Sequence, residues 1–298
     1  MRILIGIDGS EQAQRALRWG LHEARLHDAA VTVLHALRAH GHDGTSAGHE
    51  DRVSAARAFV ADAAARAGAG SDGGGDVDTI AIVDDVAARA LLDRAPGSEL
   101  VVVGSRGHGG FSGLLLGSVS LQVSTHAHVP VAVIPSDHGE DRRRDRAAIR
   151  EIVVGVDGSP PSVAALHWAV REARVRHSPL TAVHVYPHPA AALTPGVLTS
   201  LQRAGVASFQ ARAHEVAQRA LDDLIARALP PDAVGAVERT AVPGGAASVL
   251  VDEAADPATM LVVGRRGRGG FAGLLLGSVS QQCLHHARGP VVVVHQPE

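Results

Sequence analysis

The sequence contains no lysine and no asparagine, and it has a single cysteine, Cys283. One cysteine excludes an internal disulfide framework and is typical of proteins from a reducing compartment. Aromatic residues make up only 2% of the chain, so a core must be built from Val, Leu, Ile and Ala. No apolar run reaches the roughly 18–20 residues that cross a bilayer, and the run in MRILIGIDGS is too short for a secretory signal. We therefore expect a cytoplasmic protein without membrane spans.

Charge is nearly balanced, with a net charge of −3. This balance gives no reason to expect nucleic acid or an anionic membrane as a partner. The short arginine run 142–144 is flanked by Asp141 and Asp145, which indicates a solvated linker. Histidines are frequent, but His40, His42 and His49 lack ligand spacing on a rigid element. We predict surface histidines there and no metal site built by the protein alone.

The sequence contains an internal repeat that covers both halves of the chain. ILIGIDGS (3–10) returns as IVVGVDGS (152–159), and residues 103–120 return as 263–280 with three differences. The second copy has 11 additional residues, nearly all between its second and third predicted strands. Two copies of this size predict tandem domains rather than a solenoid. We predict a first domain over 1–138, a charged linker over 139–149 and a second domain over 150–298.

Apolar runs alternate with helical patterns in each copy. In the first copy the predicted strands are 3–7, 31–35, 79–83, 100–103 and 129–134, and the predicted helices are 11–28, 50–67, 86–95 and 117–127. Short, β-branched and continuously apolar strands between helices predict an α/β fold with a parallel, doubly wound sheet. Ser10 and Ser159 are suited to cap the first helix of each copy. Pro130 and Pro290 at the last strands indicate an edge position, where a strand can pair with a counterpart.

Three features should meet at the carboxyl ends of the strands, where open parallel sheets bind ligands. Asp8 and Asp157 end the first strand, and His35 and His184 end the second. A glycine-rich loop follows the fourth strand and runs into a helix. Its pattern is G-x2-G-x9-G-S, which is neither a P-loop nor a dinucleotide-binding loop.

The chemistry of this loop favours a phosphate group. Glycines let backbone amides approach an anion, and the helix start offers unpaired N–H groups and a favourable dipole. The hydroxyls of Ser118 and Ser120 are candidate additional donors. Arg106 and Arg266 are the obvious nearby cations, followed by His108 and Arg268.

These motifs together resemble a tandem universal stress protein of the ATP-binding subgroup, over essentially the whole chain. The resemblance implies a five-stranded parallel sheet with helices on both faces in each domain. It also implies that the ligand is ATP, in one interpretation together with magnesium. The last strand of each domain would be a dimerisation edge. Pairing is therefore expected either in a homodimer or between the two domains of one chain.

The residues expected at the nucleotide follow from the matching motifs. In the first domain they are Gly6, Ile7, Asp8, Ala36, Val103, Gly104, Arg106, Gly107, Gly117, Ser118, Val119 and Ser120. In the second domain they are Gly155, Val156, Asp157, Val185, Val263, Gly264, Arg266, Gly267, Gly277, Ser278, Val279 and Ser280. The first copy departs from the family pattern at Asp84 and Asp85, where the family has a glycine near the turn.

Simpler interpretations remain open for several residues. Asp8 and Asp157 could cap the turn that follows them, and His35 and His184 are expected to hydrogen-bond or pack at the strand end rather than to catalyse. Trp19 and Trp168 occupy matching helix positions that indicate packing. Cys283 has no visible base partner, which favours a structural thiol.

The leading functional hypothesis is a regulator or sensor that binds ATP and hydrolyses it slowly or not at all. Fast phosphoryl transfer needs positioned cations and a group that orients the attacking atom, and the chain has no lysine and no visible catalytic constellation. One alternative is a slow ATPase or phosphotransferase in which Asp8 and Asp157 hold magnesium. Another is an interaction scaffold with vestigial sites.

Overall fold

A computed structural model describes residues 1–37, 46–68, 77–83, 86–107, 116–136, 149–188, 206–267 and 275–296. In the first half the elements are β1 (Arg2–Ile7), α1 (Glu11–Leu26), β2 (Ala30–Leu37), α2 (Ser46–Arg66), β3 (Val77–Val83), α3 (Ala87–Arg94), β4 (Leu100–Gly104), α4 (Ser118–His126) and β5 (Val131–Ile134). In the second half they are β6 (Glu151–Gly155), α5 (Pro160–Arg176), β7 (Leu180–Tyr186), α7 (Val206–Ala228), α8 (Pro231–Val234), β8 (Val237–Pro243), α9 (Ala246–Glu253), β9 (Thr259–Gly264), α10 (Ser278–His286) and β10 (Val291–Val294).

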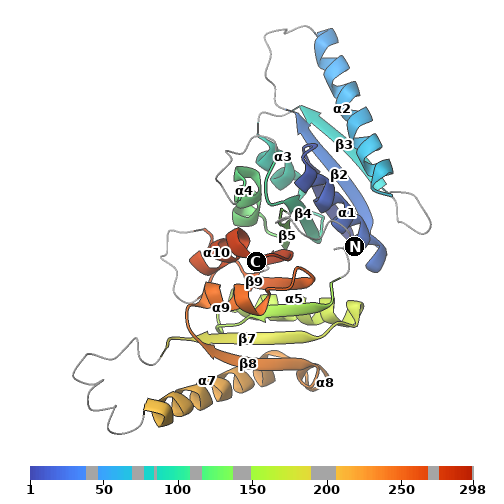
Figure 1. Cartoon of the computed structure of the whole chain (residues 1–298). Helices are drawn as coiled ribbons and strands as arrows, with labels where there is room; N and C mark the ends of the chain where they lie inside the picture. Colours follow the sequence, from blue (N-terminus) through green and yellow to red (C-terminus); the bar gives the residue numbers. More distant parts are fainter. Residues whose placement is uncertain are drawn as a thin grey trace, which may run out of the picture.

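Each half contains five parallel strands, as predicted, but the two sheets are continuous. The strand order is β3-β2-β1-β4-β5-β10-β9-β6-β7-β8, a single ten-stranded sheet (Figure 1). All pairings within a half are parallel, and the halves join through the antiparallel pair β5 and β10, with Val131 opposite Val293 and Val133 opposite Val291. The structure thus has the intramolecular pairing of last strands, and β5 and β10 are interior strands. Each of them is the edge strand of its own domain's five strands, as predicted, and becomes interior only through this pairing. Strand β5 begins after Pro130 rather than at Val129.

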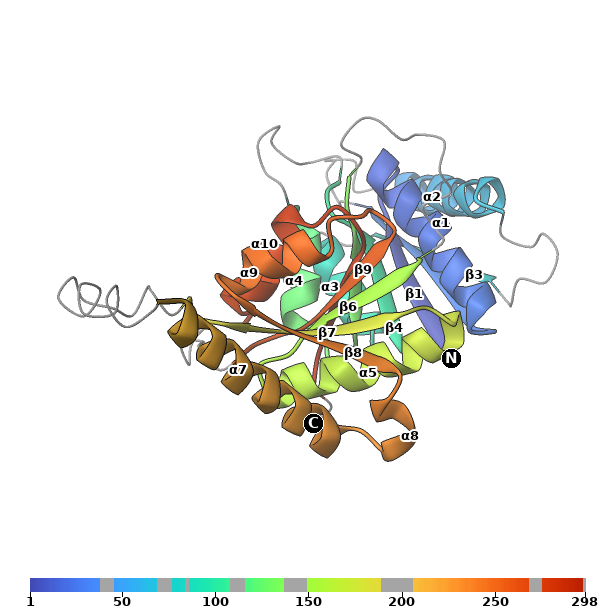
Figure 2. The same cartoon turned by 60° about the horizontal axis from the view of Figure 1, so that its bottom comes forward.

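Helices cover both faces of the sheet, because side chains of buried strands alternate between the faces. In β1, Ile3 and Ile5 belong to the core under α1, α2, α5 and α7, whereas Leu4 belongs to the core under α3, α4, α9 and α10. Figure 2 shows α5 and α7 on one side of the sheet and α9 and α10 on the other. Each core contains residues of both halves, so the two domains share their hydrophobic layers.

Local signals in the sequence explain where the first helices begin. The Ser10 Oγ accepts a hydrogen bond from the Ala13 amide at 3.1 Å, and Ser159 caps α5 in the same way. Trp19 and Trp168 are buried, 3% and 8% exposed, which confirms their packing role. Cys283 is fully buried, and burial raises the pKa of its thiol to about 12, so it is a structural thiol as predicted. None of the described helices is long and apolar enough to cross a membrane.

Candidate functional site

The Asp-Gly-Ser turn after the first strand of each domain is closed by the aspartate. Asp157 Oδ1 accepts hydrogen bonds from the Ser159 amide at 2.9 Å and from the Ser159 hydroxyl at 2.6 Å. Asp8 Oδ1 accepts from the Ser10 amide at 3.0 Å. The glycine between them has φ of 90° at Gly9, a left-handed conformation that favours glycine. The simpler interpretation is therefore confirmed for one oxygen of each carboxylate: it caps the turn.

The second carboxylate oxygen lies against the glycine-rich loop. A Cβ atom at Gly267 would lie 2.5 Å from Asp157 Oδ2, and one at Gly107 would lie 2.1 Å from Asp8 Oδ2. Both distances are too short for a side chain, so glycine is what allows the loop to approach the aspartate. The turn and the loop therefore lie side by side, although Asp8 and Gly107 are 99 residues apart in sequence and Asp157 and Gly267 are 110 apart.

The helix that follows the loop has no side-chain cap at its N-terminus. Gly277 is the N-cap of α10, and no side chain caps this end, which leaves first-turn amides for a ligand or water. The Gly277 amide donates to Arg265 O at 2.8 Å, which closes the base of the loop. The first domain repeats this geometry with Gly117 and Ser105 O, at 2.7 Å.

The second serine of each helix start has a different role from the one expected. The Ser120 hydroxyl donates to Gly104 O at 2.6 Å, and the Ser280 hydroxyl donates to Gly264 O at 2.7 Å. Both serines are 3% exposed. Their single hydroxyl proton is therefore used to tie the helix to the preceding strand, which corrects the expectation of a hydroxyl donor for a ligand. The neighbouring Ser118 and Ser278 are exposed at the helix start.

The strand-end histidines join neighbouring strands. The Nδ1–H of His35 donates to Ile7 O at 2.9 Å, and that of His184 donates to Val156 O at 2.8 Å. The His35 ring also contacts Phe59, with ring centroids 4.9 Å apart. These contacts confirm a positional role and bring the ends of the first two strands together beside the loop.

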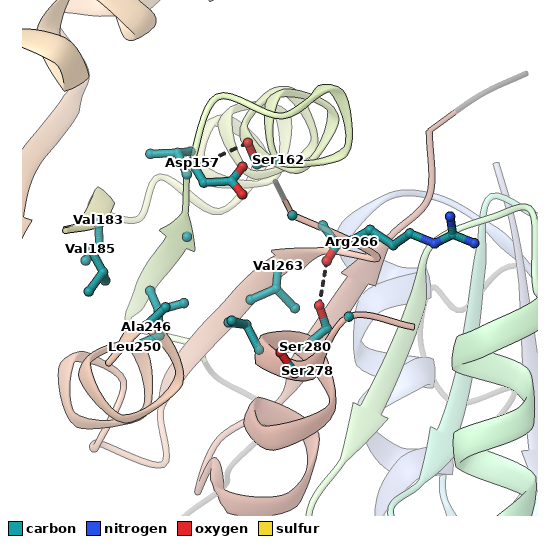
Figure 3. Close-up of a pocket in the computed structure, with 16 residues that line it drawn as sticks. Asp157, Ser162, Val183, Val185, Ala246, Leu250, Val263, Arg266, Ser278 and Ser280 are labelled. Atoms are coloured by element: carbon teal, nitrogen blue, oxygen red, sulfur yellow. Dashed lines mark hydrogen bonds between the residues drawn. The ribbon is translucent and has the colours of Figure 1, made fainter. Parts of the chain in front are cut away.

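The two arginines do not extend toward the aspartates. Arg106 Nη2 donates to Ser136 Oγ at 2.8 Å, at the end of β5. Figure 3 shows the Arg266 guanidinium pointing away from Asp157 and Ser278, although the residue itself lines the cavity. In this conformation Arg106 binds Ser136 and the Arg266 guanidinium points away from the cavity, so a role of either cation at the phosphates stays a prediction.

All twelve residues predicted for the second site line one cavity (Figure 3). Its volume is about 180 Å³, several times the roughly 30 Å³ share of one water, so it is a ligand-sized recess rather than a packing void. One wall is apolar and comes from β7, α9 and β9. The opposite wall comprises Asp157, the glycine loop and the start of α10.

Four lining residues were not predicted from the sequence: Ser162, Val183, Ala246 and Leu250. The Ser162 hydroxyl accepts from the Asp157 amide at 3.3 Å and donates to Ser159 O at 2.9 Å. Comparison of the repeats could have found it, since the first copy has Ala13 at this position. Leu250 matches Leu91, and both contact the glycine near the end of the first strand of their domain: a Cβ at Gly155 or Gly6 would lie 2.8 or 2.9 Å from the leucine.

In the first domain Gly107 approaches Asp8 and Gly117 closes the loop on Ser105, but several expected features fall outside the described residues. These are Asp84 and Asp85 at the rim, His108 and Arg268 in the two loops, and His40 and His42, as well as the side chain of His49. The rim of the first site therefore keeps its status as a sequence-based expectation.

Comparison with known proteins gives the family. The model of the universal stress protein family matches residues 1–135 and again residues 148–295. A universal stress protein of Mycolicibacterium smegmatis is 34% identical over 98% of this chain and 96% of its own length. Universal stress protein Rv2623 of Mycobacterium tuberculosis is 33% identical over 99% of this chain and 96% of its own length.

Solved structures agree on the fold. The crystal structure of a universal stress protein from Archaeoglobus fulgidus covers 99% of this chain and 96% of its own, with a TM-score of 0.63 at 19% identity. The twofold family match and the full-length relatives show that the chain belongs to the universal stress protein family, with two such domains in tandem.

Proposed function

We propose that the chain is a cytoplasmic, ATP-binding regulator or nucleotide sensor of the stress response, with slow or no hydrolysis. The observation that carries this proposal is the second-domain cavity. An apolar wall of Val183, Val185, Ala246 and Leu250 suits a flat base, and the opposite wall ends at an uncapped helix start. Such a combination of apolar lining and a few placed polar groups is typical of small-molecule sites. Backbone amides at a helix start suit a phosphate chain.

The charged groups at the cavity favour binding of the nucleotide over its rapid hydrolysis. Among its lining residues the carboxylate is Asp157 and the cation is Arg266, whose guanidinium points away. The His184 Nδ1 is held on a backbone carbonyl. Rapid phosphoryl transfer depends on cations that neutralise developing charge and on a group that orients the attacking atom. The lining residues offer neither in this conformation, which supports binding over catalysis.

Magnesium fits this site only as a companion of the nucleotide. Mg²⁺ is commonly held by one or two carboxylates together with substrate phosphates and water. Asp157 supplies a single carboxylate beside the loop. When bound, the ion would neutralise phosphate charge, and Asp157 is the residue that would hold it.

The first domain repeats the turn, loop and helix start, so we propose a second nucleotide there, with the domains bounded at 1–138 and 150–298. Asp8 and Gly107 keep the same close approach as Asp157 and Gly267. Two extra carboxylates in the segment after β3, Asp84 and Asp85, add negative charge to this domain. We therefore expect weaker binding in the first domain than in the second.

Native mass spectrometry of protein purified without added nucleotide, followed by titration with ATP, tests this function. We expect one or two adenine nucleotides per chain, with turnover far below the roughly 1–1,000 s⁻¹ of typical enzymes. Gly277→Ala should weaken the second site, because its Cβ would lie 3.3 Å from Arg265 O at the closed base of the loop. Gly117→Ala is the matched change in the first site.

Three results would decide between the hypotheses. Turnover of many nucleotides per second that disappears in Gly277→Ala would replace the sensor with an enzyme. Absence of bound or titratable nucleotide would favour the scaffold. Nucleotide that binds equally well to both glycine variants and to the unaltered chain would place the ligand elsewhere.

A further inference from the structure

The C-terminal end of α4, in the first domain, contacts the second domain. Because β5 and β10 are antiparallel, the end of β10 lies beside the start of β5 and the last turn of α4. The Nε2–H of His295 donates to Ser124 O at 3.1 Å, and Arg265 Nη1 donates to Thr125 O at 3.5 Å. Carbonyls of a last helical turn have no partner inside the helix. The second domain therefore supplies donors to the C-terminal end of α4.

Burial makes the His295 contact specific. His295 is 5% exposed and Ser124 is fully buried. Burial, aided by the nearby Arg265 charge, lowers the pKa of His295 to about 4, so its ring is neutral near pH 7. A neutral ring carries one N–H, and the geometry assigns it to Nε2. A buried carbonyl that lost this donor would be left without water to replace it.

The other end of the same helix forms the first candidate site. Helix α4 has nine residues, and its N-cap is Gly117. Its start is tied to the end of β4 by the Gly117 amide on Ser105 O and by the Ser120 hydroxyl on Gly104 O. A short helix held at both ends moves as one body. Groups that hold its C-terminal end therefore also set where its N-terminal amides lie relative to Gly104.

The reverse contact cannot be made with the same residue types. In the repeat, Ser105 occupies the position of Arg265, and Pro135 occupies that of His295. Proline has no N–H and no side-chain donor. The Ser105 hydroxyl is buried and has no hydrogen-bond partner among the described residues. At the last turn of α4 the cross-domain donors thus run from the second domain to the first.

We propose that His295 and Arg265 of the second domain are positioning residues for the first nucleotide site, which is complete only when the second domain holds α4. This rests on the proposed function, since the ligand is the nucleotide proposed above. Arg265 directly follows Gly264 of the second site, so the same contact links the two sites. Any coupling of the two sites through this contact is reciprocal by thermodynamic linkage.

ATP titration by calorimetry of chains with one usable site tests the proposal. Ala246→Trp fills the apolar wall of the second site, and Ala87→Trp does the same at the matching position of the first. Into each background we introduce His295→Leu, which removes the donor, or His295→Gln, which keeps an N–H donor. The matched control is Pro135→Ala, the equivalent position of the first domain. Amide exchange of α4 and α10 is measured on the same proteins.

We expect His295→Leu to weaken ATP binding at the first site about fivefold or more, to leave the second site within about twofold, and to speed amide exchange in α4 alone. His295→Gln should restore most of the affinity, and Pro135→Ala should change neither site. An unchanged first site, or equal weakening of both sites, would overturn the proposal while the nucleotide function stands. If the unaltered chain binds ATP at neither site, the proposed function itself is wrong. Should His295→Leu fail to fold, Arg265→Ser, which installs the first-domain residue, makes the same comparison.

Discussion

Helices α1 and α5 occupy the same position in the two domains, yet they carry different basic residues, His27 and Arg176, at one matching position. Glu23 and His27 of α1 correspond to Glu172 and Arg176 of α5, with the same four-residue spacing in each helix. The four side chains meet between the domains. Arg176 pairs with Glu23 of the other domain and, at 2.6 Å, with Glu172 of its own helix. His27 contacts Glu172 at 3.1 Å.

The difference between the copies makes this crosswise cluster asymmetric. Glu23, Glu172 and Arg176 have side chains only 1–5% exposed, whereas His27 is 14% exposed. Arginine is always charged and can bind two carboxylates, whereas histidine titrates near neutral pH. The second domain thus contributes a permanent positive charge to the domain interface, on Arg176, whereas the first contributes a charge that depends on pH, on His27. Two domains of one chain can differ at matching positions in this way, whereas two identical subunits cannot.

The largest expected effect comes from removing the permanent charge. Arg176→Ala leaves two buried carboxylates facing each other, and we expect the free energy of unfolding to fall by about 3–5 kcal/mol. His27→Ala removes a more exposed partner and should cost clearly less. Urea unfolding at pH 7 measures both. Arg219→Ala is the control, since its pair with Glu215 is exposed and should contribute within about 1 kcal/mol. A loss in Arg176→Ala no larger than in the control would mean that the cluster does not hold the domains.

The sequence predicts the elements of both copies well but says little about this interface. Strands and helices follow from continuous apolar runs and helical periodicity, which are local signals that each copy repeats. The repetition of Glu23 as Glu172 is visible in the sequence, but a repeated acidic residue on a helix is more often solvent-exposed than buried. Its burial depends on the antiparallel pairing of β5 with β10. The sequence predicts pairing of the last strands, but not which helix residues this pairing buries.

The site shows the same division. All twelve residues predicted for the second domain line its cavity, because glycine spacing and strand ends are readable one copy at a time. The direction of the Arg266 guanidinium and the use of the Ser280 hydroxyl depend on neighbours that fold beside them. The direction of a side chain depends on the residues packed around it. The sequence therefore predicts that these residues lie at the site, but not which contacts their side chains make.

The cluster should also make stability depend on pH. Burial raises the pKa of Glu23 to about 7 against the opposing effect of Arg176, and the Glu172 carboxylate raises the pKa of His27. A raised folded-state pKa means that stability is fully present below the unfolded pKa and is lost as pH rises through the folded value. We therefore expect the free energy of unfolding to fall between about pH 5 and pH 8, by about 1–3 kcal/mol for Glu23. At lower pH, below about 4.5, the lowered pKa of Glu172 acts in the opposite direction.

Glu23→Gln isolates this contribution because glutamine resembles the protonated carboxyl. The variant should match the unaltered chain at pH 5 and exceed it in stability at pH 8, so the pH dependence becomes flatter. Denaturant unfolding at several pH values gives the comparison. If Glu23→Gln is instead the less stable protein at pH 8, the pair of the ionised Glu23 carboxylate with Arg176 outweighs the cost of burial, and the folded-state pKa of Glu23 is not raised.

The smallest expected effect tests Ser162, a lining residue just after the Asp-Gly-Ser turn that is Ala13 in the first copy. Ser162→Ala installs the first-domain residue and removes two hydrogen bonds, from the Asp157 amide at 3.3 Å and to Ser159 O at 2.9 Å. We expect a loss of about 1 kcal/mol in unfolding free energy, since each bond is neutral and Asp157 remains held by Ser159. Ala13→Ser is the reciprocal control and should bring no gain unless the new hydroxyl finds both partners, because Ala13 is buried. ATP titration of Ser162→Ala then separates two explanations of the difference between the sites. Affinity that falls to the level of the first domain would trace the difference to this turn, whereas unchanged affinity would leave it with the carboxylates at the first-domain rim.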